Sequence, residues 1–519
     1  MTSDIVAISI PIGAYQIAHK LLLSIFSYKK SKHEPLIVLG GNVPSIAYNE
    51  IFQYFPRTDL FIVVGEGEES FSKILKHIDR KIDINSIPNL VRFSNGRIVK
   101  NYRKMPSLKD IIAPPYISDD IYKFINDNGG LIYLETSRGC YNNCTFCFKH
   151  TFYTNSNDNI RYFPIERFKL TLKQILNKKH AHFTIKLTDQ CLISDDNPER
   201  INSAFQHIND VTQTLATSSY KGKLVFETRI DSLYNQRESI EDQSLRSFYW
   251  EQIIKANLDY VVFGLESCCN TQLKRYGKSY NIETIEGAVK KIKTMSIPCQ
   301  FNMIMLDPLM TIDELNYNLN EIERLQILEY ITSLSKELRI TKGTPYYHLA
   351  KKYGIKIALD RENLTFYKYS YKSYIDPKIS YLIPYLRTFY KVFNDSGYRF
   401  AGIEMFLNFK NIDNRNEKAI NNILYIPRAF KNLEFSIIKY ILSNTGSKEL
   451  YIINEVKWLI SNIVYSSIKS VQESLLLDMY FEDKQILKTF LKILNDISKN
   501  TAYFSDMFVK IKTEDVLNE

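Results

Sequence analysis

A regular alternation of strand-like and helical stretches between residues 131 and 345 restricts the fold of this 519-residue chain most strongly. The strand candidates are short apolar runs at 131–135, 183–188, 223–228, 259–264, 300–306 and 335–341. The helical stretches between them lie near 165–177, 199–216, 242–256, 282–295 and 312–327. This alternation predicts an α/β fold with a parallel sheet, because parallel strands need helical crossovers. In parallel barrels the functional residues lie on the loops at the carboxyl ends of the strands.

Three cysteines follow the first of these strands at C-x3-C-x2-C spacing: Cys140, Cys144 and Cys147. Iron–sulfur cubanes are normally held by four thiolates, so a compact set of three predicts one iron that is left for a ligand from outside the protein. A structural zinc site is the alternative, because His150 could complete a Cys3His set. We favour the cluster, since zinc modules organise short, loop-rich domains and these cysteines open a long series of strands and helices.

With Phe146 before its last cysteine, the loop resembles the signature loop of the radical S-adenosylmethionine (SAM) superfamily. The resemblance implies a partial (β/α)6 barrel, a [4Fe-4S] cluster on Cys140, Cys144 and Cys147, and SAM on the fourth iron. It also implies that a one-electron donor such as flavodoxin or ferredoxin reduces the cluster and that SAM is cleaved to a 5'-deoxyadenosyl radical. Phe146 is expected near the adenine.

Polar residues at the ends of the next three strands are further candidates for binding SAM. Asp189 ends the second strand, and Glu227 and Arg229 end the third. Glu266 and Ser267 end the fourth, in a Gly-Leu-Glu-Ser run similar to the family's strand end. SAM presents a carboxylate, an ammonium and two ribose hydroxyls, which Arg and Glu side chains can bind. The alternative is that these charges pair with one another in the barrel mouth.

Two further cysteines, Cys191 and Cys268, follow strand ends and are the catalytic candidates. A thiol in that position could donate a hydrogen atom to a substrate radical. The alternative is simple burial, because free cysteines are often small buried apolar residues.

The first 80 residues repeat the alternation, with strand candidates near 4–10, 35–41 and 59–64. The stretch resembles the latter part of the cobalamin (B12)-binding domain that precedes many radical SAM cores, and it is predicted as a truncated Rossmann-like domain. The family's opening strand and its Asp-x-His-x-x-Gly loop have no counterpart, so a bound cobalamin and a vestigial docking domain both stay open. The cofactor-binding candidates follow strand ends, where open α/β sheets bind ligands: Gly40, Gly41, Glu66 and Gly67.

The expected domains are a truncated B12-binding-like domain at 1–80, a connector at 81–130, the radical SAM barrel at 131–350 and a helical C-terminal region at 351–519. An Asn-Gly pair at 95–96 predicts a hairpin in the connector. Apolar residues at helical spacing predict the C-terminal helices near 378–396, 415–442, 448–470 and 484–498.

Composition restricts the partners and the compartment. The net charge of +10 comes from 67 basic and 57 acidic residues, a mild excess in short clusters, so nucleic acid is not an expected partner. No apolar run reaches the roughly 18 residues of a membrane span, and no signal-peptide pattern opens the sequence. Because seven cysteines fit a reducing compartment, we expect a cytoplasmic protein without a membrane partner.

These features together predict a radical SAM enzyme that modifies an unactivated carbon of a natural product or of a ribosomally made peptide. Bound cobalamin would favour C-methylation, and its absence would favour epimerisation or rearrangement with a thiol as hydrogen donor. An RNA-modifying methylthiotransferase is the alternative enzyme, but that family needs three further cysteines before Cys140 and the sequence has none. A cluster-binding protein without catalysis is the remaining alternative.

Overall fold

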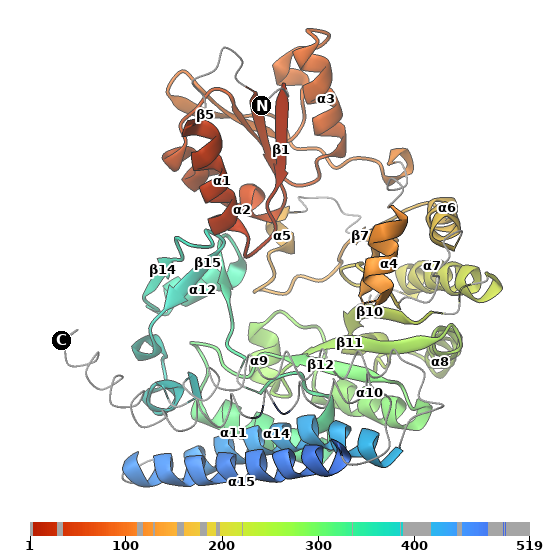
Figure 1. Cartoon of the computed structure of the whole chain (residues 1–519), viewed down its shortest axis with the longest axis vertical. Helices are drawn as coiled ribbons and strands as arrows, with labels where there is room; N and C mark the ends of the chain where they lie inside the picture. The colour runs from red at the N-terminus through yellow and green to blue at the C-terminus, as the bar shows by residue number, and fades with distance from the viewer. Residues whose placement is uncertain are drawn as a thin grey trace.

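The computed structural model describes residues 4–27, 35–111, 118–127, 130–152, 160–176, 184–193, 198–218, 220, 222–334, 336–384, 386–387, 417–443 and 449–475, together with 491 and 494. In Figure 1 an N-terminal domain lies at the top, a barrel-like sheet with its helices lies below it, and two long C-terminal helices lie at the bottom. No helix in the described part of the chain is apolar over a length that would cross a bilayer.

The N-terminal domain is built on a five-stranded sheet with the order β1-β2-β3-β4-β5. The first three strands are parallel, and a hairpin of β4 and β5 adds two antiparallel strands. The predicted Asn-Gly hairpin is therefore present, and it extends this sheet into the segment expected to be a connector. The elements are β1 (Ile5–Ser9), α1 (Tyr15–Ser27), β2 (Leu36–Gly40), α2 (Asn42–Tyr54), β3 (Leu60–Val63), α3 (Glu68–Ile78), β4 (Leu90–Ser94) and β5 (Arg97–Lys100).

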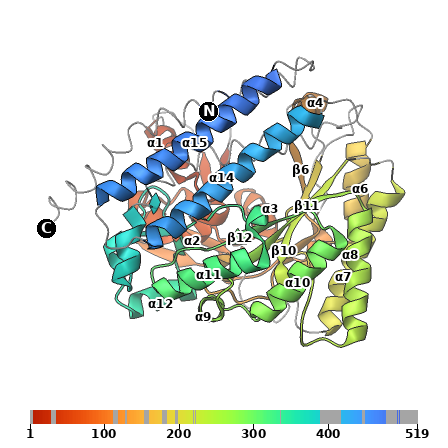
Figure 2. The ribbon, with the colours of Figure 1, turned by 90° about the horizontal axis from the view of Figure 1, so that it is seen from below.

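A second five-stranded sheet, with the order β12-β11-β10-β9-β6, forms the barrel wall, and all its pairs are parallel. Its strands are β6 (Leu131–Leu134), β9 (Thr184–Leu187), β10 (Leu224–Arg229), β11 (Leu258–Glu266) and β12 (Cys299–Met303). The helices that cover its outer face in Figure 2 are α6 (Ile165–Leu176), α7 (Pro198–Thr217), α8 (Ile240–Lys255), α10 (Ile282–Met295) and α11 (Ile312–Leu325). The shorter elements around the sheet are α4 (Asp119–Asp127), β7 (Ser137–Gly139), α5 (Lys149–Phe152), β8 (Ile160–Tyr162), α9 (Asn270–Arg275) and α12 (Pro345–Lys352).

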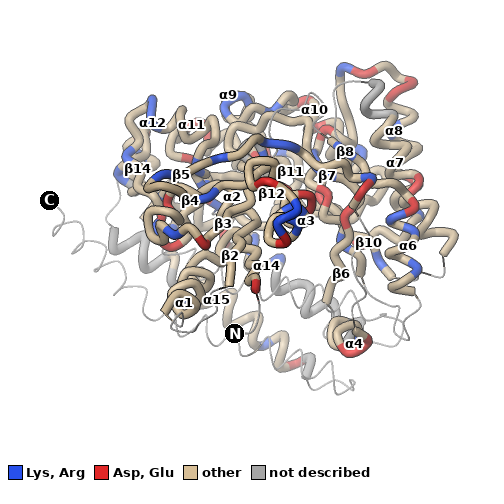
Figure 3. Tube along the Cα trace, turned by 90° about the horizontal axis from the view of Figure 1, so that it is seen from above, with Lys and Arg blue, Asp and Glu red and all other residues tan. Residues whose placement is uncertain are grey.

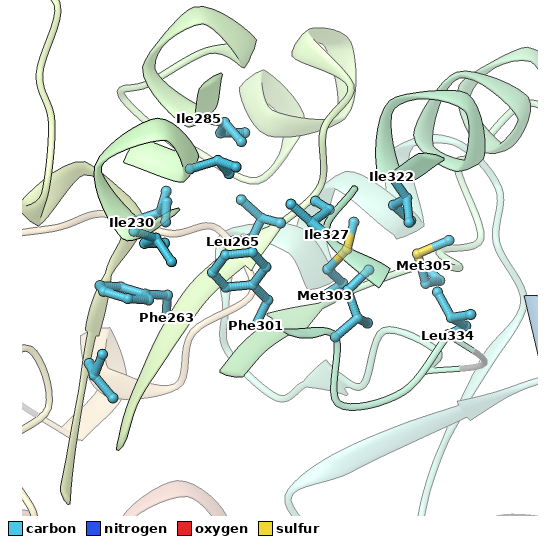
Figure 4. Close-up of a cluster of buried hydrophobic side chains, with 14 of the residues drawn as sticks. Ile230, Phe263, Leu265, Ile285, Phe301, Met303, Met305, Ile322, Ile327 and Leu334 are labelled. Carbon is cyan, nitrogen blue, oxygen red and sulfur yellow. The ribbon is translucent and has the colours of Figure 1, made fainter. Parts of the chain in front are cut away.

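Side chains alternate across this sheet, because successive residues of a strand point to opposite faces. Phe263 and Phe301 are fully buried and pack under the helices beside Leu265 and Ile285, as Figure 4 shows. Neighbouring positions such as Val262 face the other side, which becomes the inside of the barrel. The strands therefore hold an apolar outer face and a more polar inner face.

The sixth predicted strand, 335–341, is not a regular strand of this sheet in the described residues. Two isolated parallel bridges stand in its place, Phe301 with Ile331 and Leu306 with Glu337. The barrel is therefore closed on this side by irregular chain rather than by a sixth hydrogen-bonded ladder.

The end of that segment turns into a separate sheet. β13 (Ile340–Thr341) pairs antiparallel with β15 (Phe366–Tyr369), and β14 (Ile357–Leu359) completes the three strands. Aromatic residues such as those of β15 favour strands, which explains why the region after 351, predicted as helical, begins with strands.

The C-terminal helices α14 (Glu417–Ser443) and α15 (Glu449–Leu475) match two predicted helices. Ile437 and Ile460 are fully buried in the same hydrophobic core as the barrel strands and their helices. The helices thus complete the barrel core rather than build one of their own. The first part of the predicted helix near 378–396 is helical, at 378–384 and 386–387, and its remainder lies outside the described residues, as does nearly all of the predicted helix near 484–498.

Candidate functional site

One cavity of about 170 Å³ collects most of the predicted site residues at the carboxyl ends of the barrel strands. Chemistry in parallel barrels is expected at this edge, because the loops that follow the strands converge there. The predicted residues that line the cavity are Cys140, Cys144, Phe146, Cys147, Cys191, Glu227, Arg229 and Glu266.

The three cysteines lie on the segment 136–148, here called the cysteine loop, and Asp189 holds its start. The Asp189 carboxylate accepts from the Thr136 amide (3.3 Å), from the Thr136 hydroxyl (2.8 Å) and from the Ser137 hydroxyl. Burial raises the pKa of Asp189 to about 6, against the lowering effect of these hydrogen bonds. Asp189 does not line the cavity, so its predicted contact with SAM is corrected to an anchor of the loop.

The opposite side of the cysteine loop rests on the turn after α9. The Thr145 amide donates to the Tyr276 carbonyl at 2.9 Å, and the Thr145 carbonyl accepts from the Tyr346 amide at 2.9 Å. Gly277 has φ +70°, and a Cβ there would lie 2.7 Å from the Asn143 carbonyl oxygen. Only glycine fits so close to the loop. The sequence pattern alone gives no signal for Gly277.

Arg229 is buried behind Cys144 and is tied to Asp231. Its Nη2 and Nε donate to the Asp231 carboxylate at 2.6 and 2.9 Å, and its Nη1 lies 4.0 Å from Cys144 Sγ. Burial opposes the charge, but Asp231 outweighs it and raises the pKa of Arg229. The guanidinium is therefore fixed beside the sulfur, instead of presenting its fork to a SAM carboxylate as expected.

A buried ion pair that the sequence did not reveal forms the next wall of the cavity. Lys278 Nζ lies 3.1 Å from Glu266 Oε1 and 5.6 Å from the centre of the Phe146 ring. Glu266 adopts a left-handed conformation with φ 63°, and a Cβ at Gly264 would lie 2.9 Å from its carboxylate. Strained residues of this kind cluster at functional sites. Lys278 follows a helix rather than a strand, so the strand-end argument missed it.

Glu227 is the most open of the acidic candidates. Its side chain keeps 49% of its surface exposed and forms an ion pair with Lys186 at 2.8 Å on the inside of the barrel. Because water competes for such a pair, the carboxylate can exchange its lysine for a ligand hydroxyl or ammonium at little cost.

Ser267 and Cys268 lie behind the strand end and do not reach the cavity. The Ser267 hydroxyl is within 2.6 Å of Gln272 Oε1 and 2.9 Å of Asn318 Oδ1, and the residue is fully buried. Cys268 is fully buried in the apolar core, where burial raises the pKa of its thiol. Both predictions are corrected: Glu266 turns inward at the bulge, and the next two residues turn away from the inside of the barrel.

Cys191, by contrast, lies in the cavity wall and is 2% exposed. A hydrogen bond from the Cys191 thiol, supported by the positive charges of Lys149 and Arg229, lowers the pKa of Cys140 well below its usual range. Burial raises the pKa of Cys147 to about 11. The pKa values of Cys140 and Cys147 therefore shift in opposite directions.

The N-terminal candidates are three glycines at turns and helix starts and one glutamate, Glu66, that is paired with arginines. Gly41 (φ +93°) starts α2, where a Cβ would lie 2.9 Å from the Ile10 carbonyl oxygen, whereas a Cβ at Gly40 would meet nothing within 4 Å. Gly67 precedes α3 as its N-cap. Glu66 is not open to a cofactor as predicted, because its buried carboxylate contacts two arginines near the cysteine loop.

Comparisons with known proteins extend this picture. No protein-family model matches the sequence. The 4'-phospho-dehydrooxetanocin synthase of Priestia megaterium is 29% identical over 335 residues, which are 63% of this chain and 43% of that relative. A solved structure of the cobalamin-dependent S-adenosylmethionine radical enzyme OxsB, with aqua-cobalamin and S-adenosylmethionine bound, matches 98% of this chain and 73% of its own, with TM-score 0.73 and 20% identity. The chain therefore shares the fold of a cobalamin-dependent radical SAM enzyme.

A second radical SAM structure, the methyltransferase TsrM from Kitasatospora setae with tryptophan and a SAM analogue, matches 69% of this chain and 67% of its own. Its TM-score is 0.51 at 13% identity. The OxsB match covers the N-terminal domain as well as the barrel, so the predicted fold class of the radical SAM core is confirmed. The chain spans less than half the length of the Priestia relative.

The residues of this cavity supply three thiols for a cluster held at three corners, although the described residues contain no preassembled group of three His, Cys, Asp or Glu metal ligands. Three loop thiols face one cavity, and two donors lie against their sulfurs, Asn142 Nδ2 at 3.7 Å from Cys140 and Arg229 as described above. Donors to cluster sulfurs are a usual feature of iron–sulfur sites. The zinc alternative depends on His150, whose side chain lies outside the described residues.

The N-terminal strand ends fit a flat cofactor only in part. Gly40 faces open space, but a Cβ at Gly65 would lie 2.8 Å from Arg103 Nη2, so that turn is covered. A cobalamin face at this edge would therefore be formed by the turn after β2.

Proposed function

We propose that this chain is a radical SAM enzyme that cleaves SAM reductively on a [4Fe-4S] cluster and modifies an unactivated carbon of a small natural product. The observation that carries the proposal is the single cavity that joins three loop cysteines to the ionic groups of Glu227, Glu266 and Lys278. A small-molecule substrate is supported by the name of the Priestia relative, a synthase of a phosphorylated small molecule.

When bound, the cluster and SAM supply an electron and a 5'-deoxyadenosyl radical. The chain's own residues hold and orient these groups. The thiolates of Cys140, Cys144 and Cys147 would bind three irons. Lys278 would donate to the SAM carboxylate, and the Glu227 carboxylate would accept from ribose hydroxyls or the ammonium. Because the Lys278 side chain is only 3% exposed, bulk water does not compete strongly for that contact.

Cobalamin is the proposed second cofactor, seated at the Gly40–Gly41 turn of the N-terminal domain. Two findings support it: the OxsB structure that holds aqua-cobalamin matches both domains, and space is open above Gly40. With cobalamin present, C-methylation is favoured over epimerisation. A flavodoxin or ferredoxin in the cytoplasm is the proposed electron donor.

The test is anaerobic reconstitution with iron and sulfide, with and without cobalamin, followed by the visible spectrum, iron content and 5'-deoxyadenosine formation. Cys144→Ala should lose the brown chromophore and SAM cleavage together, because a cluster with two thiolate ligands is not retained. Cys191→Ala is the matched control, since this thiol faces the same cavity from another strand end. It should keep both.

Three results would contradict the proposal in whole or in part. Wild-type protein that binds zinc and no iron would refute the cluster. Equal loss of iron in Cys191→Ala would mean a fourth protein ligand, which leaves no iron for SAM. Wild-type protein that cleaves SAM but takes up no cobalamin would refute the second cofactor alone.

A further inference from the structure

The turn after β3 carries two glutamates that reach out of the N-terminal domain. Glu66 Oε2 lies 3.3 Å from Arg138 Nη1 and 3.2 Å from Arg161 Nη1, and its second oxygen contacts Arg161 Nη2. Glu68 Oε1 lies 2.8 Å from Arg138 Nη2. Acidic residues at the start of α3 and basic residues near β7 lie together in Figure 3, seen from above.

Both arginines lie on β7 and β8, the two paired strands on either side of the segment with the three cysteines. Arg138 on β7 stands opposite Arg161 on β8, and it is two residues before Cys140. The Arg138 guanidinium also donates twice to Glu135 at 2.9 Å. One side chain thus joins the end of β6, the start of the cysteine loop and the N-terminal turn.

The far end of the loop is held by the same domain. Arg103, which follows β5, donates to the Val64 carbonyl at the end of β3 and, at 3.1 Å, to the Phe152 carbonyl at the end of α5. The segment with all three cysteines is therefore attached to the N-terminal domain on both sides, at Arg138 and at Phe152.

Burial increases the effect of these ion pairs on stability. Exposed ion pairs contribute little to stability, but the side chains of Glu66, Arg138 and Arg161 are only 4%, 13% and 18% exposed. Removing the Glu66 carboxylate takes away the ion-pair partner of the buried Arg161, which is strongly unfavourable, whereas Arg138 keeps Glu135 and Glu68. Burial disfavours the charge of Glu68, yet the Arg138 hydrogen bond outweighs it and lowers the pKa of Glu68.

We propose that Glu66 is a positioning residue for the iron–sulfur site. The Gly65–Glu68 turn, at a position where cofactors are expected, instead fixes the cysteine loop through Arg138 and Arg161. This inference rests on the proposed function, because it needs the cluster. It does not need cobalamin: the contact acts whether or not that cofactor is bound.

A second interdomain ion pair offers a matched control. Glu50 on α2 pairs with Lys342, which follows β13, and both side chains are 19% exposed. This pair joins the same two parts of the chain but does not touch the cysteine loop. Glu50→Gln therefore weakens domain contact in general, whereas Glu66→Gln weakens it at the loop.

The experiment uses the full chain, reconstituted anaerobically without cobalamin, and follows iron release to a ferrous chelator together with the electron paramagnetic resonance of the reduced cluster. Glu66→Gln should release iron faster by about tenfold or more, as expected when a buried charge pair is broken. Its circular dichroism and elution volume should match wild type. Glu50→Gln should release iron at the wild-type rate.

Pairwise coupling gives a second readout. The effects of Glu66→Gln and Arg161→Gln on iron release should be less than additive in the double variant, because the two changes share the Glu66–Arg161 contact, although Arg161 also donates to the Pro106 carbonyl at 2.7 Å. Where Glu66→Gln fails to fold, Glu68→Gln serves instead: this glutamate is 39% exposed and shares Arg138, so release should accelerate less but in the same direction.

Three outcomes would overturn the inference. The first is that Glu66→Gln, or Glu68→Gln where Glu66→Gln does not fold, releases iron at the wild-type rate. The others are that Glu50→Gln accelerates iron release equally, or that the two changes in the double variant have additive effects. A wild-type protein that takes up no iron would instead refute the proposed function, so the two failures are distinguishable.

Discussion

At the scale of single residues, the cysteine loop depends on a glycine that carries no chemistry. Gly277 combines a positive φ with a 2.7 Å approach of its missing Cβ to the Asn143 carbonyl oxygen. Gly354 has a similar φ of +75°, but a Cβ there would meet nothing within 4 Å. The two glycines therefore separate backbone strain from contact with the loop.

Gly277→Ala should displace the cysteine loop and reduce iron retention, in addition to the strain of about 1–2 kcal/mol for a left-handed alanine. Gly354→Ala should show the strain alone. Iron content after gel filtration and the urea midpoint of unfolding measure the two effects. Equal iron content in both variants would show that the loop does not rest on Gly277.

The raised pKa of Asp189 leads us to predict that the stability of the protein depends on pH. Burial raises its folded pKa to about 6, above an unfolded value of about 3.9. Between these values the folded state binds more protons, so the free energy of unfolding should fall as pH rises from about 4 to about 6, by about 2–3 kcal/mol.

Asp189→Asn should remove this slope, because an amide does not titrate. Urea unfolding of the cluster-free protein at pH 4.5 to 7 measures it. Asp79→Asn, at a side chain that is 57% exposed, is the control that should keep the slope. A slope unchanged by Asp189→Asn would assign it to other groups.

At the scale of elements, a buried carboxylate ties three of them together behind the cysteine loop. Asp307, which follows β12, is fully buried and accepts from the Tyr276 hydroxyl (2.8 Å), Arg275 Nη2 (3.0 Å) and the Tyr346 hydroxyl (2.6 Å). Tyr276 directly follows α9 and Tyr346 lies on α12, and their backbones bind Thr145 of the loop. The loop is therefore supported by helices that Asp307 holds in place.

Asp307→Ala should destabilise the protein by about 3–5 kcal/mol, since it takes away the acceptor of the Tyr276 and Tyr346 hydroxyls and one of the two carboxylates of Arg275, which keeps Glu314. Tyr346→Phe, which removes one of these hydrogen bonds, should cost about 1 kcal/mol. Chemical unfolding followed by far-ultraviolet circular dichroism measures both. A small effect of Asp307→Ala would show that water satisfies the network.

How far the sequence predicts these elements depends on the kind of signal. The five strands from 131 to 303 and their helices were predictable from apolar periodicity, and Cys140, Cys144 and Cys147 from their spacing. The directions of Ser267 and Cys268 were not, because a bulge after Gly264 changes which face each residue meets. Contacts between segments that are distant in the sequence determine the roles of Lys278, Gly277 and the partners of Glu66. Local sequence patterns do not reveal such contacts.

At the scale of the whole molecule, the barrel and the C-terminal helices share one hydrophobic core, whereas the N-terminal sheet has separate clusters. Ile437 of α14 is fully buried in the barrel core, as is Trp250 of α8. Ile51 of α2 is equally buried in an N-terminal cluster. The barrel should therefore unfold together with its C-terminal helices.

Ile437→Ala should lower the stability of the barrel by about 2–5 kcal/mol, the usual cost of emptying a core site. The fluorescence of Trp250 during urea unfolding reports it, since the other tryptophan, Trp458, is 60% exposed. Ile51→Ala should shift the Trp250 midpoint less. An equal shift would mean that the two parts unfold as one unit.

The supports of the cysteine loop also bear on when metal can be inserted in the cell. They come from Glu66, Asp189, Gly277 and Tyr346, so the last of them leaves the ribosome some two hundred residues after Cys147. A nascent chain that has exposed only its thiols lacks the walls that would keep a cubane in place. Cluster delivery should accordingly follow synthesis of most of the polypeptide, and maturation factors should meet a nearly finished barrel.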